Sequence, residues 1–536
     1  MAGRGPGRDH RGPAPVTPHL VRYRSDGPGG SGPLTLGQDN MIRCMLNDAP
    51  EAINKQAVWP VPPGTTVAAA LDALRALAER HPALRTVFPG DHFTEQVELA
   101  EGEFTVAVVP VPDGDDPDRL GEELGRKGRA QAFEPATDFP LRLTLLTSGD
   151  RPVRLVVVVS HAQLDGSATA LLFRDWLLLA AGRPLPESDS PSPRELAAQE
   201  RSTAGQRRAR GALRRWERIL REDPVTVFAD DRVEPSDGLL PALLVRSATA
   251  GQALERAVRR TGASPSTLLL AAYAALVAHL ADQRTLVVAT LSANRNRAVL
   301  AGHVGTLAQD ALLSVRVPLD DPAAGFDALL RHAQAAALAG YWHATFDAQQ
   351  LWGLIDRVAH ERGARYVRHM VLNDLSSTVP DEAVARYQAP TADPEFVWLP
   401  PESAATRIML DVWRLRGEVA LSLRLDPQLF PREQGEQLAR ALLHLIEVAG
   451  ERDFLLAELP QLTGLPRARR DRPGWRLVAG SWVELEAVAA LVRSALDLAA
   501  EVSFANGELT ATMELPPGSA LTPVEAHAAV VAALPR

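Results

Sequence analysis

The chain has 536 residues, of which 46% are hydrophobic and 23% charged, with a net charge of −9 and a single cysteine. This composition excludes a mostly disordered chain, a collagen and a disulfide-stapled scaffold, and the lone Cys44 excludes a zinc site built from several cysteines. The mild acidity argues against a nucleic-acid binder, and the unpaired cysteine favours a reducing, cytoplasmic location.

The first part of the chain predicts a leader followed by an alternating lobe. Residues 1–33 are rich in Gly, Pro and Arg without apolar periodicity, so we expect a disordered leader there. Residues 34–193 predict an N-terminal lobe. Its expected elements are helices at 67–80 and 167–181 and strands at 104–109, 141–146 and 153–159. The β-branched run 153–159 predicts a strand inside a sheet with both faces covered.

The middle of the chain predicts a bridging helix at 194–222. Its arginines between Arg207 and Arg218 could suggest nucleic-acid binding, but acidic residues are interspersed, so a solvated helix face is the better interpretation. Residues 223–460 predict a second alternating lobe, with helices at 251–261, 267–280, 323–338 and 432–449 and strands at 243–247, 285–290, 312–317, 366–372 and 419–425. The apolar run 264–281 is too short and too polar to span a membrane and predicts a core helix.

The last part of the chain predicts a separate small unit. A basic linker at 461–472 precedes a small α+β tail at 473–536. We expect a strand at 475–478, a helix at 483–496, a hairpin that turns at Asn506-Gly507, and a final helix at 523–534.

One constellation can carry chemistry. The run 153–159 leads into Ser160-His161-Ala162-Gln163-Leu164-Asp165-Gly166 and then into a helix. A histidine at the mouth of a buried strand is held rigidly and can accept a proton near neutral pH. On spacing alone, a structural histidine with a turn aspartate is the better interpretation. The sequence has no phosphate-binding, nucleophile-elbow or metal motif, and the scattered His303, His343, His360 and His369 are expected to be structural.

The segment 159–166 resembles the His-His-x-x-x-Asp-Gly signature of condensation domains from nonribosomal peptide synthetases. Arg80-His81-Pro82-Ala83-Leu84-Arg85-Thr86-Val87-Phe88 is similar to a second motif of that family, Arg-His-x-x-Leu-Arg-Thr-x-Phe. Further similar segments occur in the family's order, at 34–39, 216–220, 304–310 and 343–347. The resemblance covers residues 34–455 and favours a catalytic His161.

The resemblance implies an α/β (α+β) fold of two chloramphenicol-acetyltransferase-like lobes in a V shape, with a tunnel between them. It implies a free-standing condensation enzyme that forms an amide or ester bond between groups carried on the 4′-phosphopantetheine arms of carrier proteins. No metal, nucleotide or tightly bound cofactor is implied. His161 would take the acceptor's proton or hold the nucleophile, and the Gly166 N–H would stabilise the oxyanion. Asp165 would be structural and pair with Arg295, or otherwise with Arg297.

Two departures from the family pattern leave alternatives open. Ser160 replaces the first histidine and Gln309 replaces the usual asparagine, and both are candidates to line the site. An acyltransferase that uses coenzyme A or one carrier protein with a soluble acceptor is one alternative, and a non-catalytic carrier-binding module is another. Ser160 also argues against the heterocyclisation form of the family.

The tail 473–536 resembles the small C-terminal lobe of adenylating enzymes. Gly480-Ser481-Trp482-Val483-Glu484-Leu485 would match its Gly-x-Arg-Ile-Glu-Leu, with Trp482 in place of the arginine. That lobe needs a catalytic lysine, and no lysine follows Lys127. We therefore expect a relic or docking module, or an unrelated α+β appendage, and no ATP site.

Overall fold

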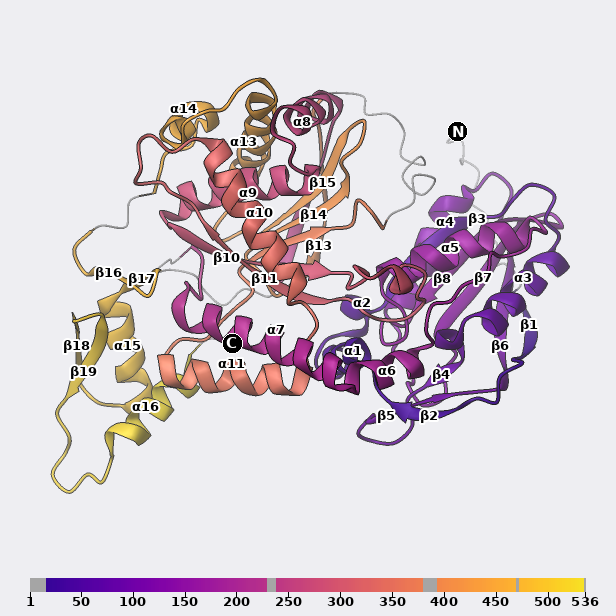
Figure 1. Ribbon diagram of the computed structural model, residues 1–536, viewed down its shortest axis with the longest axis horizontal. Helices are drawn as coiled ribbons and strands as arrows, with labels where there is room; N and C mark the ends of the chain where they lie inside the picture. Colours follow the sequence, from indigo (N-terminus) through magenta and orange to yellow (C-terminus); the bar gives the residue numbers. More distant parts are fainter. Residues whose placement is uncertain (1–15, 229–237, 379–392, 469–471, 535–536) are drawn as a thin grey trace, which may run out of the picture. The chain divides into compact units, whose positions relative to one another are not determined.

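The computed structural model describes residues 16–228, 238–378, 393–468 and 472–534 (Figure 1). The chain divides into two compact units. Unit 1 comprises Met1–Ser202 and Arg295–Leu307, and unit 2 comprises Thr203–Asn294 and Ala308–Arg536. The chain therefore leaves unit 1, returns to it for one short segment, and then completes unit 2.

Unit 1 is built on a five-stranded sheet in the order β1-β6-β7-β8-β3. Its strands are β1 (Thr17–Arg24), β3 (Lys55–Pro60), β6 (Glu101–Pro110), β7 (Leu141–Ser148) and β8 (Arg151–Val159). The β6–β7 pair is parallel and the other pairs are antiparallel. A smaller sheet in the order β2-β5-β4 is formed by β2 (Gly30–Pro33), β4 (Thr86–Val87) and β5 (Glu95–Glu98).

Helices cover both faces of the five-stranded sheet, which explains the uniformly apolar sequence of β8. Leu155, Val157 and Val159 join a core with α3 and α5, whereas Val156 packs with residues of α4. The helical segments of unit 1 are α1 (Leu36–Asn47), α2 (Pro50–Ile53), α3 (Val67–Arg80), η1 (Pro82–Arg85), α4 (Pro117–Arg129), α5 (Gly166–Ala180), α6 (Pro193–Arg201) and η2 (Ala298–Leu300). Alternate residues of β8 thus face two different helical layers.

Unit 2 is built on a seven-stranded sheet in the order β11-β10-β12-β14-β15-β9-β13. Its strands are β9 (Leu239–Ser247), β10 (Thr285–Ser292), β11 (Gln309–Arg316), β12 (Met370–Asp374), β13 (Glu395–Ser403), β14 (Ile408–Arg414) and β15 (Val419–Leu425). The β10–β12 and β12–β14 pairs are parallel, and the other pairs are antiparallel.

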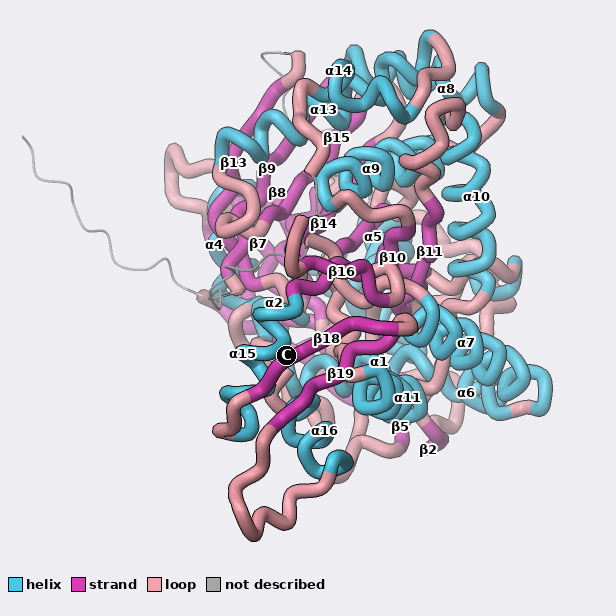
Figure 2. Tube along the Cα trace, turned by 90° about the vertical axis from the view of Figure 1, so that its left-hand side faces the viewer, coloured by secondary structure: helices cyan, strands magenta, loops and turns pink. Residues whose placement is uncertain are grey.

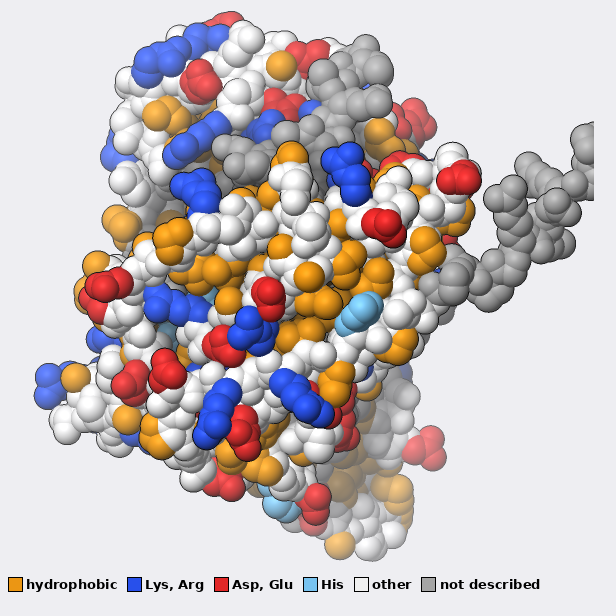
Figure 3. Space-filling model, turned by 90° about the vertical axis from the view of Figure 1, so that its right-hand side faces the viewer, with side chains coloured by type: hydrophobic (Ala, Val, Ile, Leu, Met, Phe, Trp, Pro, Cys, Tyr) orange, Lys and Arg blue, Asp and Glu red, His pale blue; other side chains and the backbone are white. Residues whose placement is uncertain are grey.

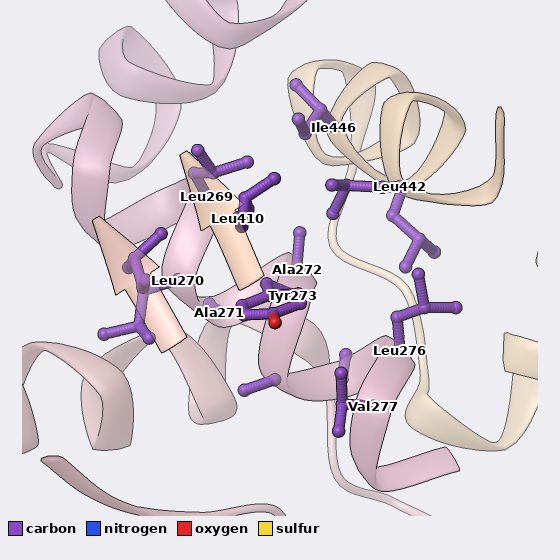
Figure 4. Close-up of a cluster of buried hydrophobic side chains, with 14 of the residues drawn as sticks. Leu269, Leu270, Ala271, Ala272, Tyr273, Leu276, Val277, Leu410, Leu442 and Ile446 are labelled. Atoms are coloured by element: carbon purple, nitrogen blue, oxygen red, sulfur yellow. The ribbon is translucent and has the colours of Figure 1, made fainter. Parts of the chain in front are cut away.

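The main core of unit 2 surrounds one buried helix, α9. Figure 4 shows the α9 side chains near Leu276 gathered with Leu410 of β14 and with Leu442 and Ile446 of α13. On the other side of the sheet, α7 and α11 form a second core with residues of β10, β11 and β12. The helical segments of this part are α7 (Thr203–Glu222), α8 (Ala248–Thr261), α9 (Pro265–Ala281), α10 (Phe326–Trp342), α11 (Ala348–Arg362), α13 (Arg432–Glu451), η3 (Leu456–Glu458) and α14 (Leu459–Thr463).

The tail of unit 2 contains two hairpins and two helices (Figure 2). They are β16 (Trp475–Val478), β17 (Ser481–Glu484), α15 (Leu485–Leu496), β18 (Ala500–Ala505), β19 (Glu508–Met513) and α16 (Pro523–Ala532). The Trp482 Nε1–H donates to the Asp282 carbonyl oxygen at 2.8 Å, and the His527 imidazole contacts the His360 carbonyl oxygen at 2.5 Å. These bonds attach the tail to α11 and to the end of α9.

The structure corrects three sequence expectations. The leader predicted over 1–33 is ordered in its described part, because β1 buries Val21 and Tyr23 in the unit 1 core. The helix predicted over 194–222 is two helices, because Ser202 is extended and its hydroxyl donates to the Gln199 carbonyl oxygen at 2.6 Å. The segment Arg295–Leu307 belongs to unit 1 and not to the C-terminal lobe.

The mixed helix-and-sheet class is confirmed, and each large sheet carries helices on both faces. On the face shown in Figure 3, Lys and Arg side chains are interspersed with Asp and Glu side chains. Among the described residues, no single helix is both long and apolar enough to cross a membrane; α8 and α9 reach that length only as a pair that bends by 102°.

Candidate active site

The turn that carries His161 is fixed at both ends by secondary structure. β8 ends at Val159, which is paired with strands on both sides, and α5 begins at Gly166. Within the turn, the Ser160 N–H donates to the Pro140 carbonyl oxygen at 2.9 Å, and the Leu164 N–H donates to the Ser160 carbonyl oxygen at 3.2 Å. The His161 side chain therefore starts from a well-anchored backbone.

Ser160 is engaged inside this turn. Its side chain is buried, and its hydroxyl donates to the Gln163 amide oxygen at 2.5 Å. The Gln163 amide nitrogen in turn donates to the Thr86 carbonyl oxygen at 3.3 Å. Ser160 thus ties the turn, through Gln163, to the segment after η1.

Asp165 and Arg295 form a buried ion pair directly after the turn. The Arg295 Nη1 donates to Asp165 Oδ2 at 2.8 Å, and the exposed fractions of the two side chains are 9% and 1%. Asp165 also accepts from the N–H groups of Ala168 and Leu307, each at 2.8 Å. Burial alone would raise the pKa of Asp165, but Arg295 and these N–H groups hold it below its usual value.

The Asp165–Arg295 ion pair attaches the returning segment to the histidine turn. Arg295 also donates to the carbonyl oxygens of His303 and Gly305, at 3.1 and 2.9 Å. The Thr306 hydroxyl donates to the carbonyl oxygen of His161 itself at 2.7 Å. The backbone of His161 is therefore held from the far side by residues that lie more than a hundred positions later in the chain.

The imidazole of His161 is in an environment that disfavours its charged form. Burial, and then the positive charge of Lys55, lower the pKa of His161 to about 4, although Asp165 opposes the shift. The ring is therefore neutral at pH 7. Its Nδ1 is buried and makes no hydrogen bond of good geometry within the described chain, while the peptide groups of His161 and Leu164 lie close to the ring.

Gly166 is the first residue of α5 and is exposed. Apart from its chain neighbours and the backbone of its own helix, a Cβ added there would meet no described atom within 4 Å, so no tertiary contact requires a glycine at this position. The first N–H groups of a helix have no partner within the helix and lie at its positive end. The N–H groups at this helix start are therefore suited to a negatively charged or polarised oxygen.

Gln309 lies in unit 2, at the start of β11. Its amide nitrogen donates to the Phe346 carbonyl oxygen at 2.9 Å, and its amide oxygen accepts from the Phe346 N–H at 3.2 Å. The buried side chain therefore satisfies both peptide groups of Phe346. These contacts give Gln309 a structural role, whereas the sequence suggested that it lines the site.

Three residues around the site have contacts that sequence reasoning did not assign, although it expected His303 to be structural. Thr306 holds the His161 carbonyl, and Gly37 packs so closely on Thr306 that an added Cβ would lie 2.1 Å from its carbonyl oxygen. His303 is buried, and its Nδ1 lies 2.8 Å from the Pro191 carbonyl oxygen. Burial lowers the pKa of His303 to about 4. No local pattern could have linked these residues, because their partners are distant in the sequence.

No metal site is evident in the described parts of the chain: no three His, Cys, Asp or Glu side chains gather closely enough to hold an ion. The site offers a neutral imidazole, the exposed Gly166 at the start of α5 and a buried ion pair beside them. This arrangement can accept a proton, position a nucleophile and stabilise a developing negative charge.

A family model of the condensation domain matches residues 32–451. The phosphinothricin tripeptide synthetase PhsC of Streptomyces viridochromogenes is 29% identical over 60% of this chain. The N-(5-amino-5-carboxypentanoyl)-L-cysteinyl-D-valine synthase of Amycolatopsis lactamdurans is 30% identical over 54% of this chain. The chain covers only 30% and 8% of the lengths of these two relatives.

Solved structures show the same fold. The condensation domain that mediates chain release from the enacyloxin polyketide synthase superposes with a TM-score of 0.62 at 17% identity, over 80% of this chain and 83% of that chain. The X-domain from teicoplanin biosynthesis superposes with a TM-score of 0.60 at 22% identity, over 79% of this chain and 96% of that chain.

Proposed function

Because this chain belongs to the condensation-domain family, we propose that it transfers an acyl or aminoacyl group from a carrier-bound thioester to an amine, or less often a hydroxyl, acceptor. The acceptor nitrogen attacks the thioester carbonyl, a C–N bond forms, the C–S bond breaks, and the proton lost by nitrogen ends on the departing thiol. The thioester would be carried on the 4′-phosphopantetheine arm of a carrier protein, which acts as substrate and not as a resident cofactor.

His161 is the catalytic residue of this proposal. Its Nδ1 is buried, so Nε2 is the nitrogen left for the acceptor. With a pKa of about 4 the ring is a weak base, but it is fully neutral at working pH and free to accept a hydrogen bond. It would orient the amine and take its proton as the C–N bond forms, when that proton becomes strongly acidic.

Gly166, Asp165 and Arg295 would support this step in different ways. The Gly166 N–H, at the positive end of α5, would stabilise the oxyanion that forms on the thioester carbonyl. Asp165 and Arg295 are positioning residues, because their ion pair joins the start of α5 to the segment that holds the His161 carbonyl. The observation that carries the proposal is a neutral histidine on a turn that β8 and α5 hold at its ends and Thr306 holds at the His161 carbonyl oxygen.

The proposal can be tested with carrier proteins loaded with a panel of aminoacyl-phosphopantetheine thioesters, using intact-mass spectrometry to detect transfer. His161→Ala should lower the transfer rate by about 10²-fold or more, the usual contribution of a general base. His444→Ala, at an exposed position on α13, should leave the rate unchanged. The transfer rate should fall on the acid side as His161 becomes protonated, with a midpoint near pH 4 rather than near pH 6.5.

Undiminished transfer by His161→Ala would remove His161 from the mechanism. Carrier binding without transfer across the panel would instead support a recruitment module. Transfer to a soluble acceptor in the absence of a second carrier protein would support the acyltransferase alternative.

A further inference from the structure

One face of helix α7 carries a row of arginines that has no part in the proposed condensation reaction. Gly211, Arg214, Arg215 and Arg218 follow the i, i+3, i+4, i+7 spacing of one helix face. The opposite face of α7, which includes Trp216, is packed in a core with α11, and the two helices lie side by side in Figures 1 and 2. The arginine face therefore points away from that core.

These residues line a surface hollow of about 260 Å³ together with His343, the residue that follows the last residue of α10. The lining of this hollow contains three guanidinium groups, one imidazole and no carboxylate. A larger hollow, at the start of α10, differs in this respect because Asp321, Asp327 and Asp453 are part of its wall. The α7 hollow is thus the more strongly cationic of the two.

The acidic residues close to the α7 hollow are engaged or too distant to neutralise it. Glu217, on the same helix, pairs with Arg221 at 3.1 Å. Asp223 acts on Arg215 and Arg218 only through space, beyond ion-pair range. Among the residues that the structure describes, none of the three hollow arginines forms an ion pair, and the Nε of Arg215 is buried without a hydrogen-bond partner.

Electrostatics within the hollow are unfavourable when it is empty. Burial and the neighbouring Arg218 lower the pKa of Arg215 below its usual value. The like charges on one helix face repel each other, and an anion between them would relieve that repulsion. Arginine is also the side chain best suited to bind phosphate through paired N–H donors.

Gly211 and His343 shape the floor of the hollow. A Cβ at position 211 would lie 3.7 Å from His343 Cδ2 and 3.8 Å from Arg214 Nη2, so an alanine would fit but would occupy the space between them. Glycine inside a helix is less favourable than alanine, so the open space comes at the expense of helix stability. The His343 Nδ1 donates to the Ala339 carbonyl oxygen at 2.8 Å, which fixes the ring against the end of α10.

We infer that Gly211, Arg214, Arg215, Arg218 and His343 form a binding site for a small multiply charged phosphate, best matched by a diphosphate group. Three guanidinium groups can bind several phosphoryl oxygens at once, and a diphosphate carries enough negative charge to balance them. The shared chemistry is the phosphoryl oxyanion, which could belong to free diphosphate or to the diphosphate of a larger small molecule. The site is separate from the candidate active site, because no residue is common to both.

The inference can be tested by isothermal titration of the full chain with sodium diphosphate, with inorganic phosphate and sodium chloride as comparisons at matched ionic strength. We expect saturable one-to-one binding of diphosphate, weaker binding of phosphate and none of chloride. The double variant R214Q/R218Q should bind diphosphate about 10²-fold more weakly, since each of the two lost charge-assisted hydrogen bonds contributes roughly tenfold. A nucleoside diphosphate in a parallel titration shows whether a larger molecule is preferred.

Two further variants keep the test decisive. R256Q/R259Q removes the same charge from exposed positions of α8 and should bind diphosphate like the wild type. G211A should keep or raise the thermal midpoint, because alanine favours the helix, and should still weaken binding by filling the hollow. The inference is overturned if diphosphate does not saturate, if R214Q/R218Q or G211A binds as the wild type does, or if R256Q/R259Q loses affinity equally.

Discussion

Asp165→Asn should destabilise unit 1 strongly while leaving the shape of the side chain unchanged. Asp165 Oδ2 accepts from both Arg295 and the Leu307 N–H, and Oδ1 accepts from the Ala168 N–H, so every available position for the new NH₂ group faces a donor. The substitution also leaves the Arg295 guanidinium buried without its counter-charge. Breaking a buried ion pair from one side costs about 3–5 kcal/mol.

That loss is large enough to measure by thermal or urea unfolding followed by circular dichroism. For a unit of this size, about 3–5 kcal/mol corresponds to a fall of roughly 6–20 °C in the unfolding midpoint. Glu123→Gln, which breaks the exposed pair with Lys127 on α4, should leave the midpoint nearly unchanged. The variant Arg295→Gln should be destabilised as well. The double variant Asp165→Asn/Arg295→Gln should lose less free energy of unfolding than the sum of the two single losses, because neither buried group is then left without its partner.

The result that refutes this reasoning is a stable Asp165→Asn protein that has lost acyl transfer. Such a protein would show that the carboxylate acts on the substrate and not on the fold. Additive losses in the double-variant cycle would equally contradict an ion pair that acts as one unit.

Three further predictions concern the stability of the two units. The pKa of His303 is about 4 in the folded protein and about 6.5 in the unfolded chain, so the unfolded chain binds the proton first as the pH falls. His303 should therefore account for about 2 kcal/mol of the folding stability that is lost between pH 7 and pH 5, measured by urea unfolding at each pH. A His303→Leu protein should lose stability less steeply over this pH range. Gly37→Ala should cost about 1–3 kcal/mol and slow acyl transfer, because the new Cβ displaces Thr306; unchanged stability and rate would contradict the close packing. Gln309→Leu should cost about 2–4 kcal/mol in thermal unfolding by leaving the buried peptide groups of Phe346 unpaired, and a neutral result would contradict that structural role.

The candidate site could be located from the sequence because its centre is local. The apolar run that became β8 and the start of α5 follow from residue pattern alone, and they place the His161 turn between them. The pairing of Asp165 with Arg295 came from family resemblance and not from pattern, since a buried ion pair between distant residues leaves no local signature.

Other parts of the fold were hidden by composition or context. β1 alternates buried and exposed residues over a short stretch, but the surrounding Gly, Pro and Arg residues obscure that alternation. β13 is largely exposed and carries two prolines, so it lacks the apolar signal of a strand and is stabilised by pairing with β9 at the sheet edge. The break between α6 and α7 falls at Ser202, whose backbone is extended and whose N–H and hydroxyl both bond the Gln199 carbonyl oxygen, a local arrangement that helix propensity alone does not predict.

The return of Arg295–Leu307 to unit 1 sets limits on how this protein can be made and divided. Unit 1 cannot finish folding as its first part emerges during synthesis, because the guanidinium that neutralises Asp165 is translated only after Thr203–Asn294. A fragment that stops at Ser202 would contain His161 and Asp165 but not the residues that secure them. An exchange of unit 1 between relatives would therefore need one junction on each side of this segment as well as the junction after Ser202, so that the His161 turn and its distant support move together.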